Sequence, residues 1–104
     1  MSQNVKLVRD KIPEIIKASG ARCEYYVAES PEYETRLYEK MREELDEFID
    51  EPCIEEAGDM YEVFLSMLRF HKIDICDVIF AAVAKKEKRG GFLKKIVLES
   101  VENP

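Results

Sequence analysis

The sequence contains no tryptophan, a single histidine and three widely spaced cysteines, Cys23, Cys53 and Cys76. Because no C-x-x-C pair occurs, neither a zinc ribbon nor a thioredoxin-like motif is present. We interpret the cysteines as reduced thiols of a cytosolic protein. The lone histidine, His71, also excludes a di-iron carboxylate bundle, which needs E-x-x-H pairs, and no EF-hand loop is found.

Long apolar runs are also missing. No apolar stretch approaches the roughly 18–20 residues that a membrane-spanning helix needs, and the first residues lead into charged sequence without the apolar run of a signal peptide. We therefore expect a cytoplasmic protein with no membrane partner. A length of 104 residues suits one domain, which we assign to residues 1–104.

Positive charge is in deficit, with 22 acidic against 16 basic residues and a net charge of −6 at pH 7. An acidic chain repels the nucleic-acid backbone unless its basic residues are segregated. Basic residues do gather near the C-terminus, but the cluster is small for a duplex footprint, so polymeric nucleic acid is not an expected partner. The cluster consists of Lys85, Lys86, Lys88, Arg89, Lys94 and Lys95.

Apolar periodicity between proline, glycine and capping residues predicts four helices. They cover residues 13–19, about 30–50, about 54–70 and about 75–88. Ser30 is the expected cap of the first long helix and Asp74 that of the last, which Gly90-Gly91 ends.

The predicted fold class is mainly α, an antiparallel bundle of three main helices with a short N-terminal helix. A small two-stranded β ribbon is allowed, because residues 22–27 and 95–98 have the composition of short strands. Apolar surface on the two long helices exceeds what one small chain can cover. We therefore expect a homodimer or a higher homo-oligomer.

Each long helix carries a carboxylate within its apolar face. On a helical wheel Glu44 lies inside the apolar arc of the first long helix, and Glu47 lies about 60° outside it, at the margin. The second long helix repeats the pattern with Glu56 inside the arc and Asp59 at the margin. The polar face of the second long helix carries residues that need only water: Glu55, Glu62, Ser66 and Arg69. The remaining helical acids are interpreted as solvated or paired at i, i+4: Glu43, Asp46, Asp50, Glu55 and Glu62.

Core-facing carboxylates are costly, because a buried charge loses several kcal/mol of solvation unless it is paired or protonated. Four such groups facing one another also repel. A divalent cation removes both costs, and carboxylate oxygens suit hard ions such as Mg²⁺ or Mn²⁺. The i, i+3 spacing on each helix makes the side chains converge, so Glu44, Glu47, Glu56 and Asp59 are the predicted metal ligands.

The acidic motifs resemble those of a known group of enzymes. Glu43-Glu44-x-x-Glu47 followed by Glu55-Glu56-x-Gly58-Asp59 is similar to the E-E-x-x-E … E-x-x-D signature of the MazG-type all-α nucleotide pyrophosphohydrolases, which include phosphoribosyl-ATP pyrophosphatases and helical dUTPases. Residues 6–13 and 89–92 resemble the small phosphoribosyl-ATP-pyrophosphohydrolase-like branch. The resemblance implies Mg²⁺ on the four carboxylates, attack of water on a nucleotide phosphorus, and release of pyrophosphate.

The sequence departs from this group at one point, because only the eight residues 48–55 separate the two acidic motifs. The connection is usually longer and helps to shape the base pocket, so the identity of the substrate is not carried over. The expected ligand is therefore a small nucleotide, such as a nucleoside triphosphate. A non-catalytic helical module that binds a nucleotide or a protein partner is the alternative.

Several residues outside the quartet are further candidates. Glu43 is the nearest carboxylate that could take a proton from the attacking water. The resemblance favours basic side chains as anchors for the outer phosphates, although cations at a helix C-terminus also serve the helix dipole without any ligand. These basic candidates are Arg9, Lys11, Lys85, Lys88 and Arg89.

Overall fold

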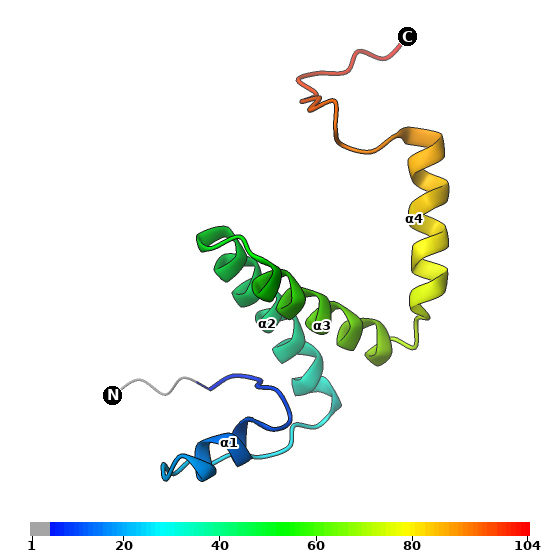
Figure 1. The fold of residues 1–104 in the computed structure, drawn as a ribbon. Helices are drawn as coiled ribbons and strands as arrows, with labels where there is room; N and C mark the ends of the chain where they lie inside the picture. The colour runs from blue at the N-terminus through cyan, green and yellow to red at the C-terminus, as the bar shows by residue number, and fades with distance from the viewer. Residues whose placement is uncertain (1–4) are drawn as a thin grey trace. The chain divides into compact units, whose positions relative to one another are not determined.

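The computed structural model describes residues 5–104, which contain four helices and no strand. The helices are α1 (Ile12–Ala18), α2 (Ser30–Asp50), α3 (Ile54–Phe70) and α4 (Ile75–Arg89) (Figure 1). The mainly α class and the short N-terminal helix are thus confirmed. The chain divides into two compact units, Met1–Lys72 and Ile73–Pro104. None of the described helices is long and apolar enough to cross a membrane.

The long helices α2 and α3 form a helical hairpin around a small core. Figure 1 shows them side by side, joined by a tight turn at Glu51–Cys53. Pro52 lies within this turn, where it interrupts the helical hydrogen bonding. The buried apolar side chains are Leu37 from α2 with Val63 and Leu68 from α3.

The segment before α1 crosses both helices of the hairpin. Arg36 of α2 donates a hydrogen bond to the carbonyl oxygen of Val5. Lys6 pairs with Glu43 on α2, and Arg9 pairs with Asp59 on α3. These contacts bring residues 5–10 to the face of the hairpin that carries the carboxylates.

The helix ends follow the expected signals with one exception. Asp74 caps α4 by accepting a hydrogen bond from the backbone N–H of Cys76 at 2.7 Å, and Gly90 ends the helix with φ of +85°. The prediction of Ser30 as a cap is wrong, because the capping residue of α2 is Glu29 and Ser30 is already helical. Pro31 then lies in the first turn, where its missing N–H needs no acceptor.

The two predicted short strands are absent. Tyr25, Tyr26 and Val27 are exposed, and they have no neighbouring strand to pair with among the described residues. Lys95 adopts a left-handed φ of +60° and donates its N–H to the carbonyl of Phe92, which is a turn and not extended backbone. A β-branched and aromatic composition alone does not make a strand without a partner edge.

Candidate metal centre

The helical hairpin brings three of the four predicted ligands together. Carboxylate oxygens of Glu44, Glu56 and Asp59 all lie within 4.8 Å of one another. Glu47, which is exposed, belongs to a second group with Glu43 and Glu44, whose carboxylate oxygens also lie within 4.8 Å of one another. Glu44 is therefore the residue that the two groups share. The first group includes residues of both helices, which the tight turn at Pro52 holds close together.

Glu44 is the most buried carboxylate of the group. Its relative exposure is 5%, although it is a charged residue on a two-helix core. Burial, followed by the hydrogen bond and charge of Glu47, raises the pKa of Glu44, and Lys40 opposes the rise only in part. One oxygen of Glu44, Oε2, is buried and accepts no hydrogen bond from a described residue. The wheel prediction for Glu44 is confirmed.

Glu56 on α3 resembles Glu44, since it too has a raised pKa and a buried carboxylate oxygen. Its Oε2 is also buried and accepts no hydrogen bond from a described residue. Desolvation and then the negative charges of Asp59 and Glu44 raise the pKa of Glu56. Since buried carboxylate oxygens are normally paired, these two unpartnered oxygens on facing helices are the candidate positions for a bound cation.

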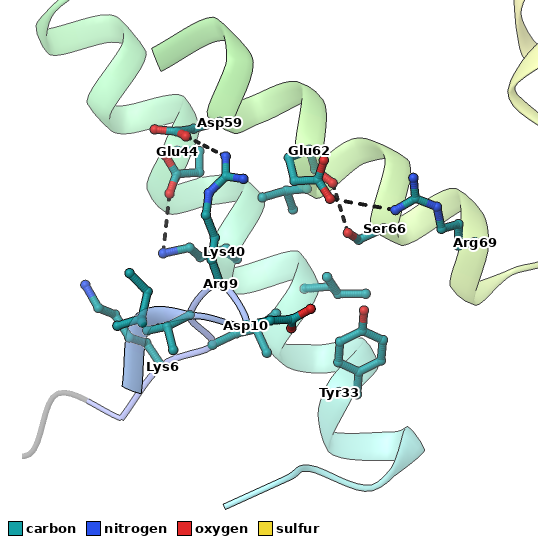
Figure 2. Close-up of a pocket in the computed structure, with 15 residues that line it drawn as sticks. Lys6, Arg9, Asp10, Tyr33, Lys40, Glu44, Asp59, Glu62, Ser66 and Arg69 are labelled. Atoms are coloured by element: carbon teal, nitrogen blue, oxygen red, sulfur yellow. Dashed lines mark hydrogen bonds and ion pairs between the residues drawn. The ribbon is translucent and has the colours of Figure 1, made fainter. Parts of the chain in front are cut away.

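Basic side chains supply part of that charge, as Figure 2 shows. Lys40 places its Nζ 3.3 Å from Glu44 Oε1 and 3.5 Å from Glu43 Oε2. Arg9 reaches Asp59, with 2.7 Å between Nη2 and Oδ1. Neither contact touches the orphaned Oε2 atoms of the two glutamates, so the centre is only partly neutralised.

A cavity of about 600 Å³ adjoins the carboxylates within the first unit. Its walls come from residues 6–10, from Ile12 and from α2 and α3, and they combine acidic, basic and apolar side chains. Glu62, Ser66 and Arg69, from the polar face of α3, line it as well (Figure 2). The apolar part of the lining is Leu7, Val8, Ile12, Leu37 and Val63, with Tyr33 beside it.

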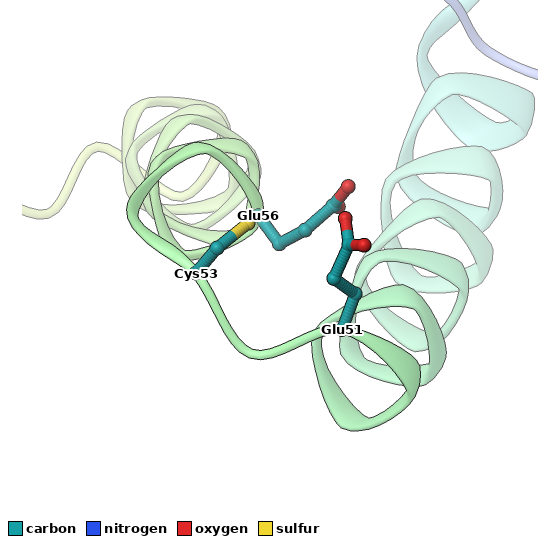
Figure 3. A group of neighbouring side chains, drawn as sticks. All are labelled: Glu51, Cys53 and Glu56. Carbon is teal, nitrogen blue, oxygen red and sulfur yellow. The ribbon is translucent and has the colours of Figure 1, made fainter.

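A third acidic group was not predicted. Glu51, Cys53 and Glu56 have ligand atoms within 4.8 Å of one another at the turn between α2 and α3 (Figure 3). Glu51 caps the end of α2 and Cys53 caps the start of α3, so both lie outside the helices and helical wheels do not place them. Their position on either side of Pro52 was the available signal. Glu56 thus belongs to two neighbouring groups.

The remaining predicted residues differ in where they lie relative to the carboxylates. Glu43 is half-buried and is held between Lys6 and Lys40. Lys11 is exposed at the start of α1 and does not line the cavity. The other three basic candidates, Lys85, Lys88 and Arg89, belong to α4 in the second unit.

Lys6 and Lys40 also line the cavity and contact carboxylates of α2, although neither was among the predicted basic residues. For Lys40 a signal existed, because its i, i+4 spacing from Glu44 predicts an ion pair on one helix face. For Lys6 only the path of the chain across α2 gives the contact.

Comparisons of the chain with protein-family models, with curated proteins and with solved structures gave no match.

Proposed function

We propose that this protein binds Mg²⁺, or Mn²⁺ in its place, through Glu44, Glu47, Glu56 and Asp59 and hydrolyses a nucleotide. The substrate is a nucleoside triphosphate or a related, phosphoribosyl-ATP-like nucleotide, and the products are a monophosphate and pyrophosphate. The observation that carries the proposal is the pair of buried, unpartnered carboxylate oxygens on Glu44 and Glu56. The likeness of the acidic motifs to the MazG-type pyrophosphohydrolases supports the same reaction.

The residues fit a hard divalent cation. The candidate donors are all carboxylate oxygens, which Mg²⁺ and Mn²⁺ prefer, and those of Glu44, Glu56 and Asp59 already lie within 4.8 Å of one another. When bound, the ion supplies Lewis-acid activation of the phosphate and of the attacking water.

The chain's own residues have separate tasks in this proposal. Lys40 and Arg9 present positive charge to the cavity beside the carboxylates, where they can hold phosphate oxygens. Glu43 lies next to Lys6 and Lys40 and is the carboxylate proposed to accept the proton of the attacking water. The apolar lining next to Tyr33 offers a surface for the base.

The test is a nucleotide panel that includes phosphoribosyl-ATP, incubated with the full chain and Mg²⁺ while pyrophosphate release is measured. We expect release from at least one nucleotide, with EDTA abolishing it. Loss of a metal ligand in Glu56→Gln should lower turnover at least about 100-fold. The matched control is Glu55→Gln, which makes the same change one residue earlier on the exposed side of α3 and should keep turnover near that of the wild type.

The panel also separates the enzyme from a non-catalytic binding module. A module would bind a nucleotide without releasing pyrophosphate and would keep that binding in Glu56→Gln. No release from any nucleotide would therefore refute the hydrolase. A cytoplasmic location, where nucleotides are abundant, belongs to the same proposal.

A further inference from the structure

The shortest ion pair described in the chain joins the N-terminal segment to the candidate metal centre. Arg9 donates to Asp59 across 2.7 Å, although the two residues are 50 positions apart in the sequence. Asp59 is also one of the three carboxylates that converge with Glu44 and Glu56. A guanidinium therefore already binds a carboxylate that a metal would use (Figure 2).

The two cations of the site are held differently. Lys40 lies on α2 itself, its side chain is only 16% exposed, and it contacts both Glu43 and Glu44. Arg9 lies on a segment before α1, its side chain is 57% exposed, and Asp59 is its one ion-pair partner among the described residues. Because an exposed ion pair contributes little net free energy, Arg9 is the cation that can leave at low cost.

A divalent ion beside Asp59 would meet the guanidinium at close range. Like charges a few ångströms apart repel, whereas the carboxylate gains more from a doubly charged ion than from the guanidinium. Arg9 also lines the cavity together with Lys6 and Lys40. A guanidinium released from Asp59 thus remains where phosphate oxygens would bind, and it has the fork geometry that phosphate favours.

We propose that Arg9 is an internal counter-cation which Mg²⁺ displaces from Asp59, and that the released guanidinium then binds the phosphates of the nucleotide. This inference rests on the proposed function for the metal and the nucleotide, and it adds how the two are coupled. The metal makes Arg9 available, so metal and phosphate bind with positive cooperativity. In the metal-free protein Arg9 partly neutralises the carboxylates instead.

The first measurement is the affinity for Mg²⁺ alone, by isothermal titration calorimetry on the full chain. Arg9→Gln removes the competitor and should bind Mg²⁺ about two- to five-fold more tightly than the wild type, and Arg9→Ala should behave in the same way. Arg9→Lys keeps the charge and should stay near the wild type. The matched control is Arg22→Gln, since Arg22 is exposed and forms no ion pair with a described residue.

The second measurement is the affinity for α,β-methylene ATP, whose α–β bridge resists hydrolysis, at saturating Mg²⁺. Here Arg9→Gln should bind about tenfold more weakly, because a charged hydrogen bond to phosphate is lost. If Arg9 had a purely structural role, its replacement would not raise the affinity for Mg²⁺ while lowering the affinity for the nucleotide.

The outcomes distinguish this inference from the proposed function. If the wild type bound no Mg²⁺, the metal centre itself would be refuted. If the wild type bound Mg²⁺ but Arg9→Gln bound it equally or more weakly, Arg9 would not compete and the inference would be overturned while the metal centre stood. If Arg9→Gln bound α,β-methylene ATP as tightly as the wild type, the proposal that the released guanidinium binds phosphate would be overturned.

Discussion

At the scale of single residues, the protein keeps a charged side chain where a soluble helix pair would normally place leucine. Glu44 follows Leu37 by two helical turns and shares its buried side of α2. The pKa of Glu44 is raised first by burial and then by Glu47. The ionised carboxylate of Glu44 therefore carries an electrostatic cost in the folded protein.

This cost predicts how stability depends on pH without metal. A raised pKa means that folded protein binds the proton more readily than the unfolded chain, so ionised Glu44 opposes folding at neutral pH. The penalty disappears as the pH falls through the raised pKa toward the ordinary glutamate value of about 4.3. We expect Glu44→Gln to be more stable than the wild type at pH 7.5 in EDTA, with the difference closing near pH 4.

Urea unfolding followed by circular dichroism between pH 4 and 8 would measure this difference. Asp46→Asn provides the control, because Asp46 lies exposed on the same helix and its replacement should have little effect at any pH. A Glu44→Gln protein less stable than the wild type at pH 7.5 would show that the Lys40 ion pair outweighs the burial of the charge.

At the scale of elements, the centre depends on the hairpin of α2 and α3. Both helices were predicted from the sequence, with α3 at the expected residues and α2 displaced only at its cap. The predicted strands failed because residues 22–27 and 95–98 find no edge to pair with among the described residues. Helical hydrogen bonds close within one segment, whereas strand hydrogen bonds need a second segment in register.

Packing of the hairpin can be tested at Leu37, which is 2% exposed and also lines the cavity. Leu37→Ala should lower the free energy of unfolding by about 2–5 kcal/mol, since it removes buried methyl groups and leaves a cavity. It should also weaken Mg²⁺ binding, because α2 and α3 would no longer hold their carboxylates at a fixed separation.

The comparison is Leu45→Ala on the same helix, where the side chain is 43% exposed and the loss should be clearly smaller. Equal losses in the two variants, measured by urea unfolding, would mean that the seam between α2 and α3 is not the core of this unit.

At the scale of the whole molecule, apolar surface exceeds what the described chain covers. Ile79, Phe80 and Val83 of α4 are all at least half exposed and share one side of the helix by their spacing. On the hairpin, Ile49 and Tyr61 are exposed as well. Such surface is costly in water, and we propose that a second copy of the chain covers it.

We therefore expect light scattering after size exclusion to give the mass of at least two chains. Phe80→Glu should lower that mass toward one chain, because a charge would have to be buried at the interface. Lys85→Glu adds negative charge on the opposite side of α4 by helical geometry and should leave the mass unchanged. A wild-type mass of one chain at micromolar concentration would refute the oligomer.

The helices and the inward direction of Glu44 and Glu56 could be predicted from the amino-acid pattern alone. Both follow from the 3.6-residue period, because a regular helix fixes which side chains share a face. The same period placed Asp59 and Glu47 at the margins of those faces. Local spacing could also have identified Lys40 as the partner of Glu44.

Contacts between groups far apart in the sequence follow from the folded arrangement of the chain and could not be predicted. Arg9 reaches Asp59 over 50 positions and Lys6 reaches Glu43 over 37, and neither pair is encoded by any local period. The cavity, with Glu62, Ser66 and Arg69 in its wall, forms because residues 6–12 cross the hairpin. The group at Glu51 and Cys53 depends likewise on the shape of the turn at Pro52, since the backbone there leaves the helical geometry from which faces can be deduced.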